Sequence, residues 1–132
     1  MKFMSLLPKS VSRYSSLSWH DSQTVRGVRF AVRRISLAQR LELTRKTREL
    51  TLRYEFLNAG ELSGQLDAAL SDLLVRKLYL EWSLAEIQGL QIDDQPATLE
   101  SLIEKGPEEL AGEIVSVIRQ EIELSEDERK NF

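Results

Sequence analysis

Two stretches of helical periodicity, residues 36–58 and 62–86, place the strongest constraint on the fold of this chain. In the first, Ser36 and Gln39 form a capping-box pattern, apolar residues recur three and four positions apart, and Asn58-Ala59-Gly60 follows as a helix-ending sequence. In the second, leucine and alanine form a broad apolar stripe. The sequence therefore predicts two long amphipathic helices that pack around one core.

Shorter segments predict minor β structure. Residues 28–33 roughly alternate apolar and basic side chains, as a half-buried strand does. Residues 87–92 alternate weakly and end in Asp93-Asp94-Gln95-Pro96, a typical turn sequence, which favours a small strand or hairpin. The two aspartates are interpreted as turn formers rather than as ligands of a divalent ion, because no further ligands follow at a metal-binding spacing.

The last third of the chain predicts two more helices. Thr98 is placed to cap a short helix over 99–105, and Gly106-Pro107 fits the start of a helix that reaches about residue 122. Ser125 has a second capping-box pattern, so a frayed, highly charged last turn is expected after it. The predicted fold is mainly α, an α+β arrangement with minor β.

Residues 1–25 are rich in serine and lack steady periodicity, which predicts a flexible N-terminal arm ahead of a single domain over 26–132. Within the arm, Tyr14 and Trp19 are candidates for docking it, either on the core of its own chain or on a partner. The first ten residues lack a signal-peptide core, and no apolar run approaches the roughly 18 residues of a membrane span. A cytoplasmic protein without a membrane segment is expected.

No pattern in the sequence predicts catalytic chemistry. The chain has no cysteine, its six glycines are scattered rather than gathered in a phosphate-binding loop, and its one histidine, His20, falls in the expected arm, where an exposed position is predicted. We therefore expect no enzyme activity, no catalytic residues, no cofactor and no metal site.

The net charge of −3 hides a division between the two halves of the chain. Residues 1–58 hold 12 basic and four acidic residues, whereas residues 59–132 hold six basic and 17 acidic residues. Nucleic-acid binding, contact between the halves and contact between copies are all consistent with this division. Because bases alternate with acids along the first helix, as Arg45 does with Glu49, nucleic-acid binding is the weaker alternative and head-to-tail contact between copies the sharper hypothesis.

Several short segments carry a resemblance to a known family. The chain resembles the small tail assembly chaperones of tailed phages and prophages over residues 26–131, at RFAVRRIS (29–36), YEFLNAG (54–60), YLEW (79–82), GLQID (89–93), GPEEL (106–110) and LSEDERKN (124–131).

The resemblance implies a non-enzymatic, mostly helical protein of the bacterial host cytoplasm that binds the tape measure protein, keeps it soluble during tail assembly and tends to self-associate. Alternatives are a structural tail or virion component and a helical nucleic-acid-binding protein. A long helical partner favours helix-in-groove recognition. Our candidate contact residues are aromatic and aliphatic side chains on amphipathic faces, for which core packing is the other interpretation: Leu50, Tyr54, Leu57, Tyr79 and Trp82.

Overall fold

The computed structural model describes residues 11–55 and 62–130, the side chains of 54–55, 62–67 and 124–130 excepted. Its elements are β1 (Leu17–Asp21), β2 (Arg29–Arg33), α2 (Leu37–Glu55), α3 (Leu62–Ser83), β3 (Leu84–Gln88), β4 (Gln91–Ile92), β5 (Gln95–Pro96), α4 (Leu99–Lys105) and α5 (Glu108–Lys130). The prediction of a mainly α fold with minor β is confirmed. No helix in these described ranges is both long and apolar enough to cross a membrane.

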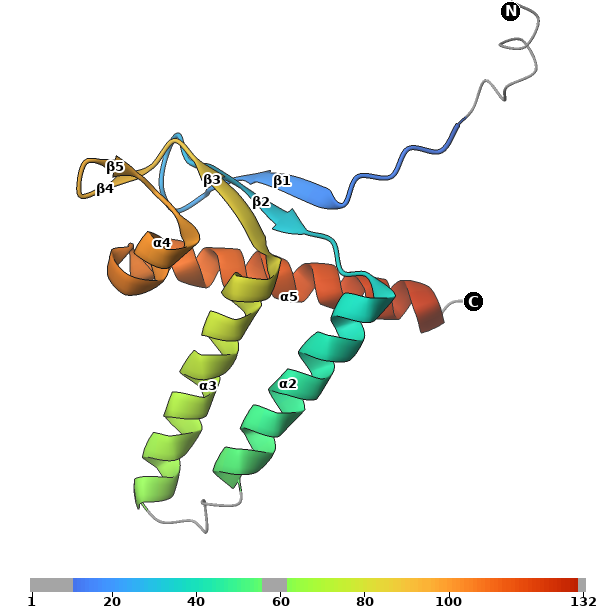
Figure 1. Ribbon diagram of the computed structural model, residues 1–132, viewed down its shortest axis with the longest axis vertical. Helices are drawn as coiled ribbons and strands as arrows, with labels where there is room; N and C mark the ends of the chain where they lie inside the picture. The colour runs from blue at the N-terminus through green and yellow to red at the C-terminus, as the bar shows by residue number, and fades with distance from the viewer. Residues whose placement is uncertain (1–10, 56–61, 131–132) are drawn as a thin grey trace, which may run out of the picture.

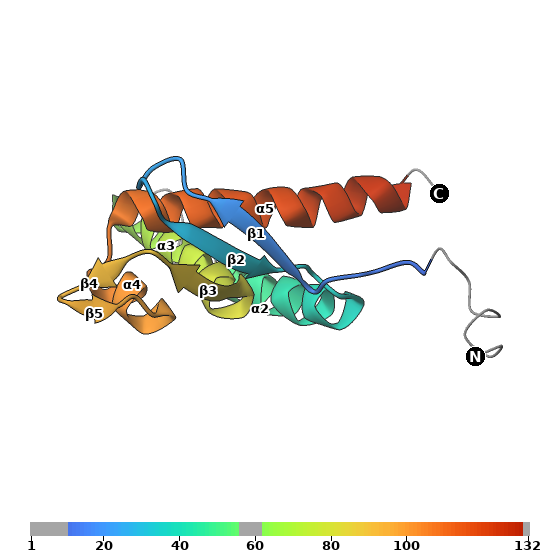
Figure 2. The same cartoon turned by 90° about the horizontal axis from the view of Figure 1, so that it is seen from above.

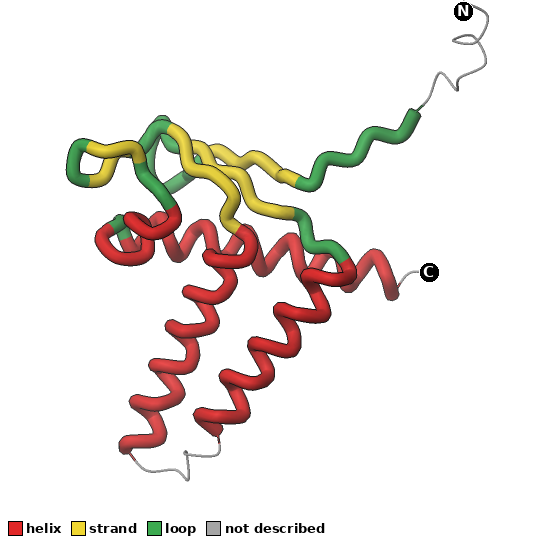
Figure 3. Tube along the Cα trace, viewed as in Figure 1, coloured by secondary structure: helices red, strands yellow, loops and turns green. Residues whose placement is uncertain are grey.

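The molecule has a body and a helical projection (Figure 1). The body consists of a three-stranded antiparallel sheet in the order β1-β2-β3, packed on α5. Helices α2 and α3 lie side by side and extend away from the body on the side opposite the sheet, which the tube view also shows (Figure 3). Viewed from above, the strands run obliquely across α5 (Figure 2).

The core lies between the sheet and α5. Phe30 and Val32 of β2 are fully buried, and α5 presents Leu110, Ile114 and Ile118 to them at helical spacing. The predicted strand near 28–33 is confirmed as β2, the central strand of the sheet. Phe30 and Val32 alternate along β2 and therefore point to the same side, toward α5. Ala31, which points to the other side, is buried as well.

The prediction of a flexible arm is wrong for residues 17–21, which form β1. This strand pairs antiparallel with β2, so that His20 lies opposite Phe30 and Leu17 opposite Arg33. Its inward side chains are Ser18, which is 8% exposed, and His20, which stacks on Phe30 with ring centroids 5.6 Å apart. Polar inward residues hide the period of two that marks a strand. The prediction that His20 is exposed is also wrong, because its ring stacks on Phe30 and is half-buried.

The second long helix is shorter than predicted. It ends at Ser83 rather than near Glu86, and the apolar residues that follow form β3, where Leu84 pairs with Val32 and Ile87 with Phe30. A short apolar run fits the end of a helix and a buried strand equally well. Pairing with β2 therefore decides that this segment is a strand. The first long helix is described to Glu55, and its predicted end at Asn58 lies outside the described residues.

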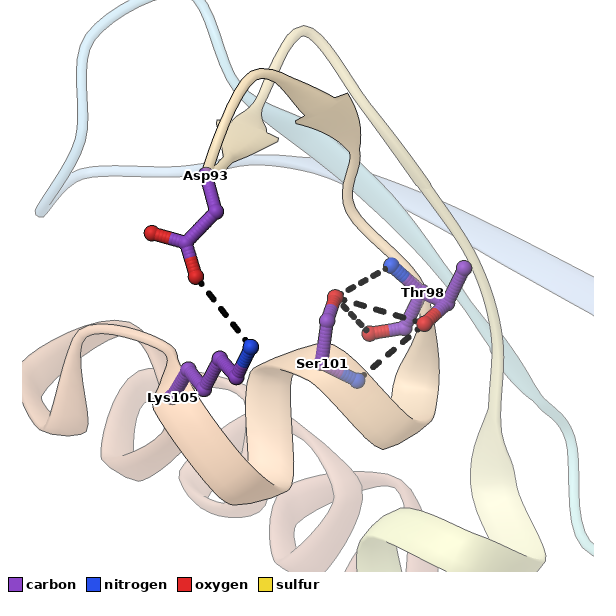
Figure 4. A network of polar contacts seen from close by, with 4 residues as sticks. All are labelled: Asp93, Thr98, Ser101 and Lys105. Carbon is purple, nitrogen blue, oxygen red and sulfur yellow. Dashed lines mark hydrogen bonds and ion pairs between the residues drawn. The ribbon is translucent and has the colours of Figure 1, made fainter.

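The predicted turn at Asp93-Asp94 is confirmed. The strand or hairpin predicted near 87–92 corresponds to the end of β3 and to β4, which pairs with β5 in a hairpin over 91–96. Both aspartates have positive φ, 52° and 64°, as a tight turn of mirror-image type requires. Figure 4 shows that Asp93 reaches Lys105 of α4, with Nζ 3.3 Å from the carboxylate. The turn therefore helps to hold the hairpin against α4.

The predicted cap of α4 is also confirmed (Figure 4). Thr98 Oγ1 accepts a hydrogen bond from the backbone N–H of Ser101 at 3.1 Å, and Ser101 Oγ accepts one from the backbone N–H of Thr98 at 2.8 Å. Helix α5 begins after Gly106-Pro107 as expected, but it is continuous to Lys130. The prediction of an end near 122 followed by a separate last turn is wrong, because Ser125 lies inside the helix.

Glu113 of α5 holds the loop between β1 and β2. Its carboxylate accepts hydrogen bonds from Ser22 Oγ and from the backbone N–H of Gln23, both at 2.6 Å. Burial alone would raise the pKa of Glu113, but the hydrogen bonds from Ser22, Gln23 and Thr24 outweigh it and lower the pKa below its ordinary value of 4.5. The loop thus stabilises the ionised carboxylate.

Replacing Glu113 by glutamine is expected to lower the free energy of unfolding at pH 7 by about 1–2 kcal/mol, because one charged acceptor of two hydrogen bonds is lost. Since the folded-state pKa is lowered, the contribution of the carboxylate is present above pH 4.5 and is lost as the pH falls through the lowered value. Urea unfolding of both proteins across this pH range measures the effect. An equal difference in stability at every pH would contradict the assignment.

Candidate protein-binding surfaces

The projecting helices expose large apolar side chains. Leu52 of α2 is 51% exposed and Leu73 of α3 is 53% exposed, and Leu41 and Leu70 are likewise exposed. Leu70 and Leu73 stay exposed because α2 and the body cover other sides of α3, which also carries charged residues. This projection therefore offers surface for another protein.

One groove follows α2 where it meets the body, and we call it the α2 groove. It has a volume of about 370 Å³. Its wall is formed mainly by α2, with one residue each from α3 and α5: Leu43, Thr47, Thr51, Leu52, Tyr79 and Ile122. Leu52 both lines the groove and is exposed, so its apolar side chain is accessible to a partner in the groove.

The charged side chains along the α2 groove are basic. Arg48 lines it, is exposed, and forms no ion pair within the part of the chain that the structure describes. Arg40 also lines it and donates a hydrogen bond from Nη2 to the carbonyl oxygen of Ile122 at 3.0 Å. A groove lined by aliphatic side chains, Tyr79 and three threonines, together with two arginines, suits an amphipathic segment that carries acidic residues on one flank.

A second groove lies between α3, α4 and the first half of α5, and we call it the α3–α5 groove. It has a volume of about 360 Å³ and an apolar lining that includes Leu73, Leu80, Leu102, Ile103 and Val115. Gly112 also lines it, and a Cβ added there would meet nothing within 4 Å. The α5 backbone is therefore directly accessible at this point of the groove.

Of the five predicted contact residues, the structure describes the side chains of three, and it does not place these three in one groove. Tyr79 lies in the α2 groove with the Arg119 guanidinium 5.6 Å from its ring centre, whereas Leu50 lines a separate hollow beside Leu78. Trp82 has Lys46 Nζ 5.8 Å from its ring centre. The side chains of Tyr79, Leu50 and Trp82 are all half-buried. The Tyr54 side chain and Leu57 lie outside the described residues. Their role in partner binding stays a prediction.

The two aromatic residues proposed for docking lie on the surface. Trp19 is on β1, 38% exposed, with the Arg29 guanidinium 4.5 Å from its ring centre. Tyr14 precedes the strand, is 72% exposed, and has the Arg34 guanidinium 6.0 Å away. Arginine stacking covers one face of each ring and leaves the rest available for contact with a partner.

Sequence reasoning missed Leu52 and Leu73 as surface residues. Both fit a helical apolar pattern, which indicates a core position as readily as a binding position. The sequence signal for Leu73 was the width of the apolar stripe of α3. Leucine recurs on more sides of this helix than a single packing face covers.

Among the residues that the structure describes, no group of three or more histidine, aspartate or glutamate side chains is placed to hold a metal ion. The two grooves are candidate sites for binding another protein. Comparison of the chain with protein-family models, with curated proteins and with solved structures finds no match.

Proposed function

We propose that this protein is a non-enzymatic tail assembly chaperone, which binds the phage tape measure protein in the host cytoplasm and keeps it soluble until the tail tube assembles. The α2 groove, with Leu52 exposed beside it, is the observation that carries the proposal. A long helical protein with apolar faces aggregates unless those faces are covered. The family resemblance of residues 26–131 supports the choice of partner.

In the proposed complex, an amphipathic helix of the tape measure protein lies along the α2 groove. Its apolar side chains, spaced three and four residues apart, contact Leu43, Leu52 and Tyr79. An acidic residue on its flank lies near Arg48, which orients the helix. The groove is short compared with a tape measure protein, so many copies of the chaperone coat one partner.

The test is co-expression of the tape measure protein with the wild-type chain or with Leu52→Glu. The wild type is expected to co-purify with its partner and raise its soluble yield, while Leu52→Glu weakens binding about tenfold or more, because a charge replaces a leucine that becomes buried. Leu41→Glu is the matched control: Leu41 is exposed on the same helix but does not line the groove.

If the wild type forms no complex and leaves the solubility of the tape measure protein unchanged, the proposed function is wrong. Equal loss of binding in both leucine variants would refute the α2 groove as the contact surface. Mass spectrometry of purified particles separates a chaperone from a structural tail component, since a chaperone is absent from finished tails.

A further inference from the structure

We propose that the β1–β2 hairpin binds single-stranded nucleic acid on the face of the sheet that points away from α5. Two exposed aromatic side chains and three exposed arginines carry this inference, and we call them the hairpin face: Tyr14, Trp19, Arg29, Arg33 and Arg34. The proposal does not rest on the proposed function, because the hairpin face shares no residue with the α2 groove. The sheet also lies on the side of the body opposite the α2 and α3 projection (Figure 1).

The pairing of the two strands places the centre of the hairpin face. His20 and Phe30 are paired and stack on the inner side of the sheet, so the residues next to them in each strand point outward. In this register, Arg29 and Arg33 are the two diagonal neighbours of Trp19 on β2. All three outward side chains are exposed. The sheet therefore presents an indole ring flanked by two arginines.

Both aromatic rings of the hairpin face already stack with arginine. The guanidinium carbon of Arg29 lies 4.5 Å from the centre of the Trp19 ring, and that of Arg34 lies 6.0 Å from the centre of the Tyr14 ring. Nucleobases stack on aromatic rings and on guanidinium planes. Because an extended chain spans at most ~3.6 Å per residue, the two rings lie within roughly 18 Å of each other. One short strand can reach both.

The hairpin carries positive charge that its own acids do not neutralise. Residues 11–34 contain five arginines and one acid, Asp21. None of these arginines forms an ion pair with any residue in the described part of the chain, although Glu86 of β3 points to the same side of the sheet. On α2, by contrast, Arg45 is held by Glu42 at 2.8 Å. The charge of the hairpin therefore favours a polyanion.

The combination of rings and arginines selects nucleic acid over an acidic protein segment. Carboxylates of a peptide would pair with the arginines but would leave the aromatic rings unused, whereas a nucleic-acid strand supplies phosphates for the arginines and bases for the rings. Arg33 is positioned for such a contact, because its Nη1 donates to the carbonyl oxygen of Leu84 at 3.2 Å and a guanidinium has further N–H donors. A single strand is favoured because its bases are free to stack.

Fluorescence anisotropy with labelled oligonucleotides of about 12 nucleotides tests the proposal, since one small domain covers ~4–16 nucleotides. Oligothymidylate and oligouridylate distinguish DNA from RNA as the source of the strand. The wild type is expected to bind at least one of them, and to bind a duplex of the same length about tenfold more weakly. Three arginine–phosphate contacts predict a slope of about 2 for the logarithm of the dissociation constant against that of salt, at ~0.7 per contact.

Substitutions at Trp19 separate base stacking from apolar contact. Trp19→Leu keeps an apolar side chain without the ring and is expected to weaken binding about tenfold. Trp19→Phe keeps a ring and is expected to bind within about threefold of the wild type. Trp19 lies outside the buried apolar cluster, so both variants are expected to fold, which circular dichroism checks.

A matched pair of arginine variants tests the position of the charge. Arg29→Gln is expected to weaken binding about threefold and to lower the salt slope by about 0.7, because one phosphate contact is lost. Arg45→Gln removes the same charge from the exposed side of α2 and is expected to leave both quantities unchanged, since Glu42 and Glu49 already hold Arg45. Equal effects of the two substitutions would show that general attraction, and not the hairpin face, accounts for binding.

Three further outcomes overturn the proposal. The first is no binding of either oligonucleotide by the wild type at low salt and about 100 μM, where even a weak site is occupied. The second is a Trp19→Leu protein that binds like the wild type. The third is displacement of the oligonucleotide by polyglutamate of equal charge at equal concentration, which would assign the hairpin face to an acidic protein segment. Leu52→Glu, designed to impair the α2 groove, is expected to leave oligonucleotide binding unchanged, so the two proposals fail separately.

Discussion

Replacing Phe30 by alanine is expected to lower the free energy of unfolding by about 3–5 kcal/mol, the largest effect of any substitution considered for this fold. The ring is completely buried and lies at the centre of the sheet, opposite His20 of β1 and Ile87 of β3. It also belongs to the apolar cluster that includes Leu110 and Ile114 of α5. Its removal leaves a cavity between the sheet and the helix.

Urea unfolding followed by circular dichroism measures this effect, with Phe30→Leu as the control. Leucine keeps most of the apolar volume and is expected to reduce stability by less than about 1.5 kcal/mol. Equal losses from the two substitutions would show that the ring does not fill the core as described. Proteolysis at the β1–β2 loop is a second readout, because the cavity weakens the contact that holds the sheet on α5.

The second large effect is expected from Gly89→Ala, which should lower the free energy of unfolding by about 2–4 kcal/mol. Gly89 follows β3 with φ at +82°, a conformation that side chains rarely adopt. In addition, an added Cβ would collide with the carbonyl oxygen of Gly27 in the neighbouring loop. The carbonyl group of Gly27 belongs to the backbone and cannot rotate out of the way as a side chain could. The loop that contains Gly27 and the loop that contains Gly89 must therefore move apart.

Gly27→Ala separates the two causes. Gly27 has nearly the same φ, +83°, but an added Cβ there meets nothing within 4 Å. The expected loss is about 1–2 kcal/mol, from backbone strain alone. Thermal unfolding of both variants therefore gives the contribution of the collision by difference. A Gly27→Ala protein as unstable as Gly89→Ala would contradict the close approach of the two loops.

Local signals in the sequence predicted those elements whose ends depend on nearby residues. The Thr98 cap of α4, the Gly106-Pro107 start of α5 and the turn at Asp93-Asp94 were all recognisable, because each rests on contacts within four residues along the chain. The central strand β2 was recognisable from its alternation. These features depend on backbone geometry that a short segment defines by itself.

Strand pairing lay beyond sequence reasoning. Residues 17–21 have no clear apolar alternation, and they form β1 because β2 offers an open edge and because Phe30 provides a surface for His20. Likewise, Leu84 continues the pattern of α3 yet joins the sheet, since pairing with Val32 buries it in the core. The β1–β2 pairs join residues 8 to 16 positions apart and the β2–β3 pairs join residues 52 to 59 positions apart. Both separations exceed the three or four residues over which local sequence signals act.

The candidate surfaces divide in the same way. The sequence by itself determined that the chain forms two long amphipathic helices, and that basic and acidic residues fall in different halves of the chain. Only the tertiary structure decided which leucines stay exposed, and that Tyr79 and Leu50 lie in different hollows. The physical reason is that periodicity defines the faces of a helix, whereas the neighbours that cover a face come from distant parts of the chain.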